Sequence, residues 1–264
     1  MKALCPGPCH ALLVAFVVQC ICTPHLHASD IEPTLKISPQ KIEIHAFYHG
    51  TTLVIKGTVP ADSKVALVVS GKEKAHTLKR KDRVGPFWMN VDTVIIKGVP
   101  EMYFLATSTD TQKELGPPEF LAKHAIGYDA LRESTIIEQE NSDHDSTFRE
   151  FIKLKEHMGL YKTFPHSIEL DPLGENSARF AVSLPIPPMV PPGEYGISMY
   201  CFEDDQPLSN KSTKLTVQKV GLPEKLSALA FDHAALYGIL AIVVAIVAGL
   251  FTGFLFGKKG KGGH

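Results

Sequence analysis

Apolar and polar residues alternate along much of the chain between Lys41 and Thr109. Ile42 and Ile44, for example, are separated by Glu43. Because successive side chains of a strand point to opposite faces, this period of two predicts half-buried strands. The alternating runs recur about every ten residues with turn residues between them, which is typical of an antiparallel β-sandwich.

Two segments of this region depart from simple alternation. The run Val65–Val69 is apolar throughout, which predicts a strand covered on both faces. The run Ala75–Lys81 is polar and basic, as in an edge strand whose charges discourage pairing with another chain. The second half of the chain predicts further strands around Phe180–Leu184, Tyr195–Phe202 and Leu215–Val217. Before the second of these, Pro192 and Gly193 predict a type II turn.

The period changes between the two sets of strands. Apolar residues at helical spacing predict two amphipathic helices, at 118–133 and 147–158. Thr147 and Glu150 form a capping-box pattern at the start of the second helix, and Gly159 is placed to end it.

The sequence therefore predicts a mainly β fold, an immunoglobulin-like antiparallel β-sandwich with a two-helix insertion at about 118–162. An alternative is two related sandwiches. Val99–Tyr103 and Val190–Tyr195 each place a proline-containing turn before a strand that starts with tyrosine, a faint internal echo. The echo is short, so one sandwich is the preferred prediction.

The carboxy-terminal region has one continuous apolar stretch, Ala234–Phe256, of 23 residues without a charge. At 1.5 Å per residue, such a helix can cross the roughly 30 Å hydrocarbon core of a bilayer. Lys258, Lys259 and Lys261 follow it at once. Because lysines next to a membrane helix favour the cytoplasmic side, residues 257–264 are predicted to be a cytoplasmic tail.

The amino-terminal region has the features of a secretory signal. Lys2 precedes the apolar run Ala11–Cys22, which is too short to span a bilayer. Ala28 at −1 and Leu26 at −3 offer an acceptable, imperfect cleavage site before Ser29. We therefore expect a signal peptide at 1–28 and an exported domain at 29–227. The alternative is a second membrane anchor.

Cysteine usage and charge limit the class of protein further. After removal of the signal, Cys201 is the one remaining cysteine, so the exported domain must be held together by its core rather than by a disulfide. Its strand position, on the face shared with Ile197 and Met199, predicts a packed core residue. The chain has 27 Lys and Arg against 28 Asp and Glu, a balance that indicates no nucleic-acid partner.

Several segments in order along the chain carry a family resemblance. They are Arg83–Asn90, Phe148–Tyr161, Val190–Tyr195 and the run Lys219–Leu222 before the membrane stretch. With them the chain resembles a family of transmembrane proteins from alphaproteobacteria. The resemblance implies an envelope protein of the bacterial inner membrane, single-pass, with a periplasmic amino-terminal domain and a cytoplasmic carboxy terminus. It implies no catalytic residues, and it gives a context beside permeases that resemble sulfite or anion exporters.

Candidate chemistry is sparse. His45 and His49 have a metal-ligand spacing, but they flank a strand end, where a site would need a third ligand from elsewhere. The run Asp143–Asp145 lies before a helix, where acidic residues favour the helix dipole without any metal. No phosphate-binding loop, nucleophile elbow or paired CxxC motif occurs. We therefore expect no enzyme activity, no cofactor and no metal, although catalytic groups could still converge from distant positions.

Trp88 is the one tryptophan of the chain. One interpretation is a large side chain that covers a sheet. The other is an exposed contact for a partner, and since Phe87 must face the opposite way, one of these two aromatics is expected to point outward. The basic run Lys79–Arg83 is interpreted as a solvated hairpin edge, with an anion or lipid-headgroup site as the alternative.

The membrane stretch carries small residues at every fourth position, which are Ala241, Ala245, Gly249, Gly253 and Gly257. Small residues at this spacing let a second helix approach closely. They therefore predict a contact within the membrane, either with a second copy of the chain or with another membrane protein. The alternative is that the spacing only reflects the composition of membrane helices.

Together these observations favour a non-enzymatic single-pass envelope protein. Its expected role is that of an accessory or interaction partner of a membrane complex, and an anion or sulfur-compound permease is one candidate. Its partners would be the lipid bilayer and a homodimer or membrane-protein contact through the helix. A periplasmic sensing or ligand-binding module is the alternative, and an enzyme of unknown type is third.

Overall fold

The computed structural model describes residues 32–111, 114–138 and 143–257. Strands are the commonest element of this part of the chain, at 47% against 27% for helices. Their bounds are β1 Thr34–Ser38, β2 Lys41–Ile44, β3 Thr51–Pro60, β4 Lys64–Ser70, β5 Glu73–Val84, β6 Phe87–Pro100, β7 Tyr103–Thr107, β8 Ile136–Glu138, β9 Tyr161–Phe164, β10 Leu170–Pro172, β11 Ser177–Ile186, β12 Gly193–Glu203 and β13 Gln206–Lys219. The predicted signal peptide at 1–28 lies outside the described residues.

The strands form three sheets. One has the order β1-β3-β11-β10, a second has the order β2-β13-β12-β4-β7-β9, and a third has the order β5-β6-β8. Neighbouring strands are antiparallel, except for the pairs β2–β13 and β7–β9 within the second sheet. The predicted mainly β class is therefore confirmed, while the immunoglobulin-like type stays a prediction.

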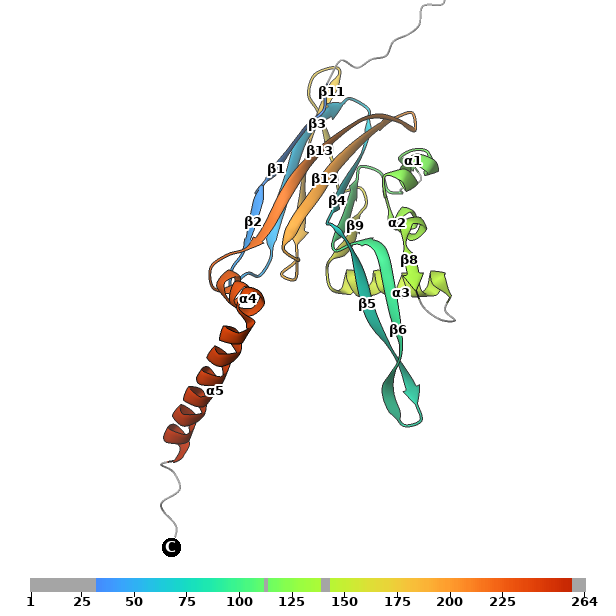
Figure 1. Cartoon of the computed structure of the whole chain (residues 1–264). Coiled ribbons are helices and arrows are strands. Elements are labelled where there is room, and N and C mark those ends of the chain that lie inside the picture. The colour runs from blue at the N-terminus through green and yellow to red at the C-terminus, as the bar shows by residue number, and fades with distance from the viewer. Residues whose placement is uncertain (1–31, 112–113, 139–142, 258–264) are drawn as a thin grey trace, which may run out of the picture. The chain divides into compact units, whose positions relative to one another are not determined.

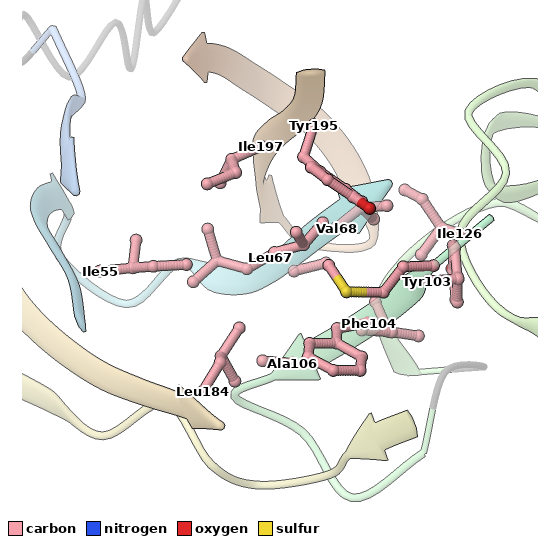
Figure 2. Packing of buried hydrophobic residues seen from close by; sticks show 14 of the residues in the cluster. Ile55, Leu67, Val68, Tyr103, Phe104, Ala106, Ile126, Leu184, Tyr195 and Ile197 are labelled. Carbon is pink, nitrogen blue, oxygen red and sulfur yellow. The ribbon is translucent and has the colours of Figure 1, made fainter. Parts of the chain in front are cut away.

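The first two sheets share one hydrophobic core (Figure 2). Ile55 on β3 and Leu184 on β11 lie beside Leu67 on β4 and Ile197 on β12, and all four are fully buried. Every second residue of β11 is buried, whereas the five central residues of β4 are all buried. The alternation of one strand and the continuous apolar run of the other therefore match their places in the sandwich, as the sequence predicted.

The region between the sandwich strands contains three helices rather than the predicted two. They are α1 Pro118–Lys123, α2 Tyr128–Ser134 and α3 His144–His157. The expected single helix at 118–133 is broken because Ala125 and Gly127 both take a positive φ, of 50° and 100°, which a helix cannot contain.

The two ends of α3 differ in how well the sequence predicted them. Its N-cap is Asp143, whose carboxylate accepts a hydrogen bond from the backbone N–H of Asp145, so the capping box predicted at Thr147 and Glu150 is wrong. Gly159, directly after the C-cap Met158, has a φ of 71°, the conformation that commonly ends a helix, as predicted.

The type II turn predicted at Pro192 and Gly193 is wrong. Gly193 does not take the positive φ that this turn requires, and it is instead the first residue of β12.

The third sheet is built around a long hairpin. β5 pairs with β6 along nearly its whole length, and β8 adds to the other side of β6 near its base. β5 is therefore an edge strand, as its basic composition predicted. Figure 1 shows β5 and β6 as a long twisted hairpin whose closed end lies apart from the other labelled elements.

Two helices follow the last strand, and they are α4 Leu222–Asp232 and α5 Ala234–Gly257. Within α5, the 22 residues Ala234–Leu255 have a mean hydropathy of 2.6, and none of the helix window that could cross a membrane is buried against the rest of the described chain. The predicted membrane helix is therefore present as one long, uncovered apolar helix. Most of the predicted tail at 257–264 lies outside the described residues.

Candidate functional site

The closed end of the β5–β6 hairpin is the first candidate site. Val84 and Phe87 form the last strand pair, so Gly85 and Pro86 make a two-residue turn. Gly85 has a φ of 63°, which such turns favour at their first central position and which glycine adopts without steric cost. The turn thus fixes the register of the side chains around it.

Large apolar side chains at this end are exposed. Phe87 is 69% exposed, Trp88 71%, Met89 53% and Val91 46%. The same strand becomes buried from Val94 onward, where it reaches the body of the domain. We call Phe87, Trp88, Met89 and Val91 the hairpin tip.

The two aromatics of the hairpin tip correct one expectation. Phe87 and Trp88 point to opposite faces, as expected for neighbours on a strand, but both are exposed. The sequence predicted that only one of them would point outward. The reason is that a hairpin extending beyond the sandwich has no covered face at this end. Trp88 is thus exposed, as a partner contact requires, while the contact itself stays a prediction.

The strand register separates the tip into two faces. Arg83 lies opposite Trp88 and Lys81 lies opposite Asn90, so these four residues share one face. Phe87 and Met89 alternate with them and lie on the other face, where they pair with Val84 and Asp82. The tip therefore has phenylalanine and methionine on one face and tryptophan with two basic residues on the other.

The basic residues of the hairpin remain at the surface. The Lys79 ammonium donates a hydrogen bond to Thr93 Oγ1 at 2.7 Å, and Arg83 Nε donates to the carbonyl oxygen of Gly85 at 3.1 Å. Lys79 and Arg83 are both exposed, and so is Lys81. Their positive charge is therefore accessible to an anionic surface.

A second polar feature, which the sequence analysis did not single out, lies at the base of the hairpin. Lys155 on α3 is only 6% exposed. Its Nζ donates a hydrogen bond to the carbonyl oxygen of Glu101 at 3.2 Å and lies 5.5 Å from the ring centres of both Phe151 and Tyr161. Burial lowers the pKa of Lys155 from 10.5 to about 8.

His76 on β5 lies beside this lysine. Its ring centre is 5.6 Å from that of Phe151, and its Nε2 is buried without a hydrogen-bond partner in the described chain. Burial, with a further contribution from the charge of Lys155, lowers the pKa of His76 from 6.5 to about 4. Lys155 could have been found from its spacing, since it follows Phe151 by four residues on the buried face of α3.

A cleft of about 470 Å³ lies between α2 and α3. Charged groups line it, and Arg132 and Asp145 form an ion pair with 3.1 Å between nitrogen and oxygen. Tyr128 and Phe148 supply apolar surface to the same cleft. The cleft could therefore accept a small polar ligand, provided that the ligand competes with this ion pair.

The predicted candidates for metal chemistry are not brought together. His45 and His49 lie in the loop after β2, where His45 Nδ1 accepts a hydrogen bond from the Phe47 N–H at 3.3 Å. Asp143 caps α3, as described above. Across residues 32–111, 114–138 and 143–257, no three His, Cys, Asp or Glu side chains are grouped as a metal site.

Cys201 lies in the core with no exposed surface, as predicted. Burial raises the pKa of its thiol to about 11. A thiol in this state is a poor nucleophile at neutral pH, because the thiolate is the reactive form. Cys201 therefore has a packing role.

The small residues of the membrane stretch lie on α5. Ala241, Ala245, Gly249 and Gly253 are all exposed, and a methyl group added at either glycine would meet no other atom within 4 Å. Gly257 is the last residue of the helix. Nothing in the described chain covers this surface, and its contact with another helix stays a prediction.

Comparison with known proteins agrees with the presence of a membrane helix. No curated protein matches the chain. A family described as "Putative transmembrane protein (Alph_Pro_TM)" matches residues 34–258, which include every described strand and the whole of α5. The chain therefore belongs to the Alph_Pro_TM family of transmembrane proteins.

Proposed function

We propose that this protein is a non-enzymatic accessory protein that holds its β domain at a membrane surface for contact with a membrane complex. The observation that carries the proposal is the short connection between the domain and the membrane helix. β13 ends at Lys219, α4 follows after Val220 and Gly221, and α5 begins two residues after α4 ends.

The start of this connection is also tied to the domain. The Val220 N–H donates a hydrogen bond to the carbonyl oxygen of Ile44 at 3.0 Å, and Lys219 Nζ donates to Ser227 Oγ at 3.1 Å. At 1.5 Å per residue, the 11 residues of α4 span roughly 16 Å. The β domain is thus held close to the bilayer, where its protein partners would also be membrane-bound.

The proposed location is the bacterial inner membrane, with the domain in the periplasm and the carboxy terminus in the cytoplasm. Lys258, Lys259 and Lys261 after the helix support this orientation. The partner would be a membrane complex, with an anion or sulfur-compound permease as one candidate. The small residues of α5 offer one route of contact, with a second copy or with another protein.

The test is cross-linking of the full-length, tagged protein in native membranes, followed by its purification. The matched control keeps the signal, α4 and α5 but replaces the β domain by an unrelated exported domain. We expect a defined membrane protein that co-purifies with the natural chain and not with the control. Identical sets of proteins from both chains would contradict a specific accessory role of the β domain.

A second candidate function is a sensing or ligand-binding module, which the cleft between α2 and α3 favours. A ligand that binds only the folded state raises the midpoint of thermal unfolding. A screen of small anions against the full-length protein in detergent should then find a stabilising compound. The shift should become smaller in Arg132→Gln, which removes one of the three cations that line the cleft but keeps much of the side-chain volume.

A further inference from the structure

The hairpin and the membrane helix leave the same end of the second sheet. β4 and β13 both pair antiparallel with β12, so they run in the same direction. The hairpin begins directly after β4, and α4 and α5 begin directly after β13. We call the end of the sandwich at which β4 and β13 finish the anchor end.

The most exposed apolar side chains gather at the anchor end. Outside α5, the five most exposed large hydrophobic residues of the described chain are Phe231 at 86%, Phe47 at 80%, Trp88 at 71%, Phe87 at 69% and Met189 at 61%. Phe231 lies on α4, Phe47 in the loop between β2 and β3, and Met189 in the loop between β11 and β12. Because β2 and β11 also finish at this end, all five residues belong to segments beside the membrane anchor.

The opposite end of the sandwich differs. Its large exposed hydrophobic residues in the described chain are Leu173, 43% exposed, in the β10–β11 connection, and Leu208, 37% exposed, near the start of β13. Ile136 on β8, 59% exposed, and Leu154 on α3, 42% exposed, lie outside both ends. Exposed apolar side chains that gather in one region usually mark a contact surface. At the anchor end the bilayer fits as that contact, because the anchor already brings it within reach.

The charge of the hairpin also fits a bilayer surface. Between residues 79 and 92 the sequence has four basic and two acidic residues. Basic residues close to a membrane are attracted by anionic lipid headgroups, and tryptophan prefers the boundary between headgroups and acyl chains. The hairpin tip combines both, with Trp88 on the same face as Arg83 and Lys81.

The hairpin is long enough to reach the bilayer. Its 12-residue strand β5 spans roughly 40 Å at 3.3 Å per residue. Gly196 pairs with both Ser70 and Lys214, so β13 runs on past the end of β4 by roughly 17 Å. An extended hairpin therefore passes the end of β13 by roughly 25 Å. The connection through α4 with its three flanking residues covers about the same length.

We propose that the hairpin tip inserts into the interface of the same bilayer that holds α5. Phe87 and Met89 contact the acyl chains, Trp88 lies at the headgroup boundary, and the basic residues of the hairpin face lipid phosphates. The β domain then has two membrane contacts, which fix its orientation. This contact does not depend on the protein partner proposed above.

The test uses Trp88 as a natural probe, because it is the one tryptophan of the chain. The full-length protein is reconstituted into phosphatidylcholine vesicles with or without phosphatidylglycerol, and a second set carries brominated acyl chains. We expect Trp88 emission at shorter wavelength than for tryptophan in buffer, with a loss of intensity in the brominated vesicles. Both effects should be stronger with phosphatidylglycerol at low salt.

The matched control moves the probe to the other end of the sandwich in the double variant Trp88→Phe, Leu173→Trp. Its emission should resemble that of exposed tryptophan and should not be quenched by brominated lipids. Equal quenching at both positions would overturn the proposal, as would unshifted and unquenched emission of Trp88.

Two other occupants of the tip give different results, and each overturns the proposal. A second copy of the chain would shift the emission of Trp88 in a way that depends on the protein-to-lipid ratio, without quenching by brominated lipids. A protein partner would shift it only after membrane proteins are added.

The headgroup part of the proposal has its own test in the double variant Lys79→Glu, Lys81→Glu, which should remove the dependence on phosphatidylglycerol. Equal quenching of the natural chain in neutral and anionic vesicles would contradict that part.

Discussion

β4 and the outer half of β6 are both rich in apolar residues, yet they lie in opposite environments. The five central residues of β4 are buried between the two sheets of the sandwich. The first five residues of β6, which include the hairpin tip, are all exposed. The two strands differ in their neighbours, because β4 lies between β12 and β7 in the sandwich while the hairpin tip pairs with β5 alone. An apolar strand end that the described part of the chain leaves exposed is available for contact outside the chain, and we propose the bilayer as that contact.

The largest effect that separates the two regions should be on stability. Leu67→Ala in β4 removes a fully buried side chain and should lower the free energy of unfolding by about 2–5 kcal/mol. Trp88→Ala at the hairpin tip should change it by less than about 0.5 kcal/mol, because the side chain is largely exposed. Denaturant unfolding of both full-length variants, followed by the β signal in circular dichroism, measures the two values. A similar loss in both variants would mean that the hairpin tip is packed against the domain.

This comparison also shows which parts of the fold a sequence can predict. The continuous apolar run Val65–Val69 and the alternation around Phe180–Leu184 report local side-chain spacing, and both strands have the burial that the spacing predicted. The apolar helix after Ala234 was predicted for the same reason. Such features depend on residues that are close together in the sequence, so the sequence alone is enough to predict them.

Features that depend on distant segments were not predicted. Exposure of both Phe87 and Trp88 requires knowing that the hairpin extends beyond the sandwich. Burial of Lys155 requires His76 and Glu101 from a different part of the chain. The break of the first predicted helix depends on the backbone of Ala125, a residue type that gives no warning of a positive φ.

A second prediction concerns pH and the base of the hairpin. The pKa of Lys155 is about 8 in the folded chain and 10.5 when exposed, so between these values the unfolded chain binds more protons. Lys155 should therefore cause stability to rise as the pH increases from about 8 to 9, by on the order of 1 kcal/mol. Above about pH 9 the buried thiol of Cys201, whose pKa is raised to about 11, acts in the opposite direction. His76, whose pKa falls from 6.5 to about 4, should likewise cause stability to fall as the pH decreases from 6.5 to 4.

Unfolding midpoints measured across this pH range test the second prediction. In Lys155→Met the unfolding midpoint should depend less on pH above about 8, and in His76→Leu it should depend less on pH between 6.5 and 4. Each variant should leave the direction of the other pH dependence unchanged. A rise above about pH 8 that persists in Lys155→Met would show that another group causes it.

A third prediction concerns the small residues of α5. Gly249→Leu with Gly253→Leu adds bulk to the surface proposed for helix contact while raising hydrophobicity, so the protein should still insert but should associate less strongly, by about 1 kcal/mol. Cross-linking in native membranes measures the association. The control Val244→Phe with Val247→Phe adds bulk on other faces and should matter less. If the glycine variant retains all its cross-linked products, the spacing of small residues reflects composition alone.

The smallest expected effect concerns Cys201. Because this buried thiol is the one cysteine of the predicted mature chain, reductant should leave the unfolding midpoint unchanged. A thiol reagent should modify the protein only after unfolding, and Cys201→Ser is the control for that modification. A lower midpoint in reductant would indicate a disulfide, because reduction of a native disulfide usually lowers the free energy of unfolding of a small exported domain by several kcal/mol.

The claim that connects the two regions is that one membrane helix separates the β domain from the carboxy terminus. Two fusions of a reporter that distinguishes cytoplasm from periplasm test it directly, one after His264 and one that replaces the chain after Gly221. The account predicts a cytoplasmic signal from the first fusion and an exported signal from the second, since α5 lies between the two sites and lysines follow it. Signals from the same side of the membrane would contradict both the anchored topology and the placement of the hairpin tip beside the bilayer.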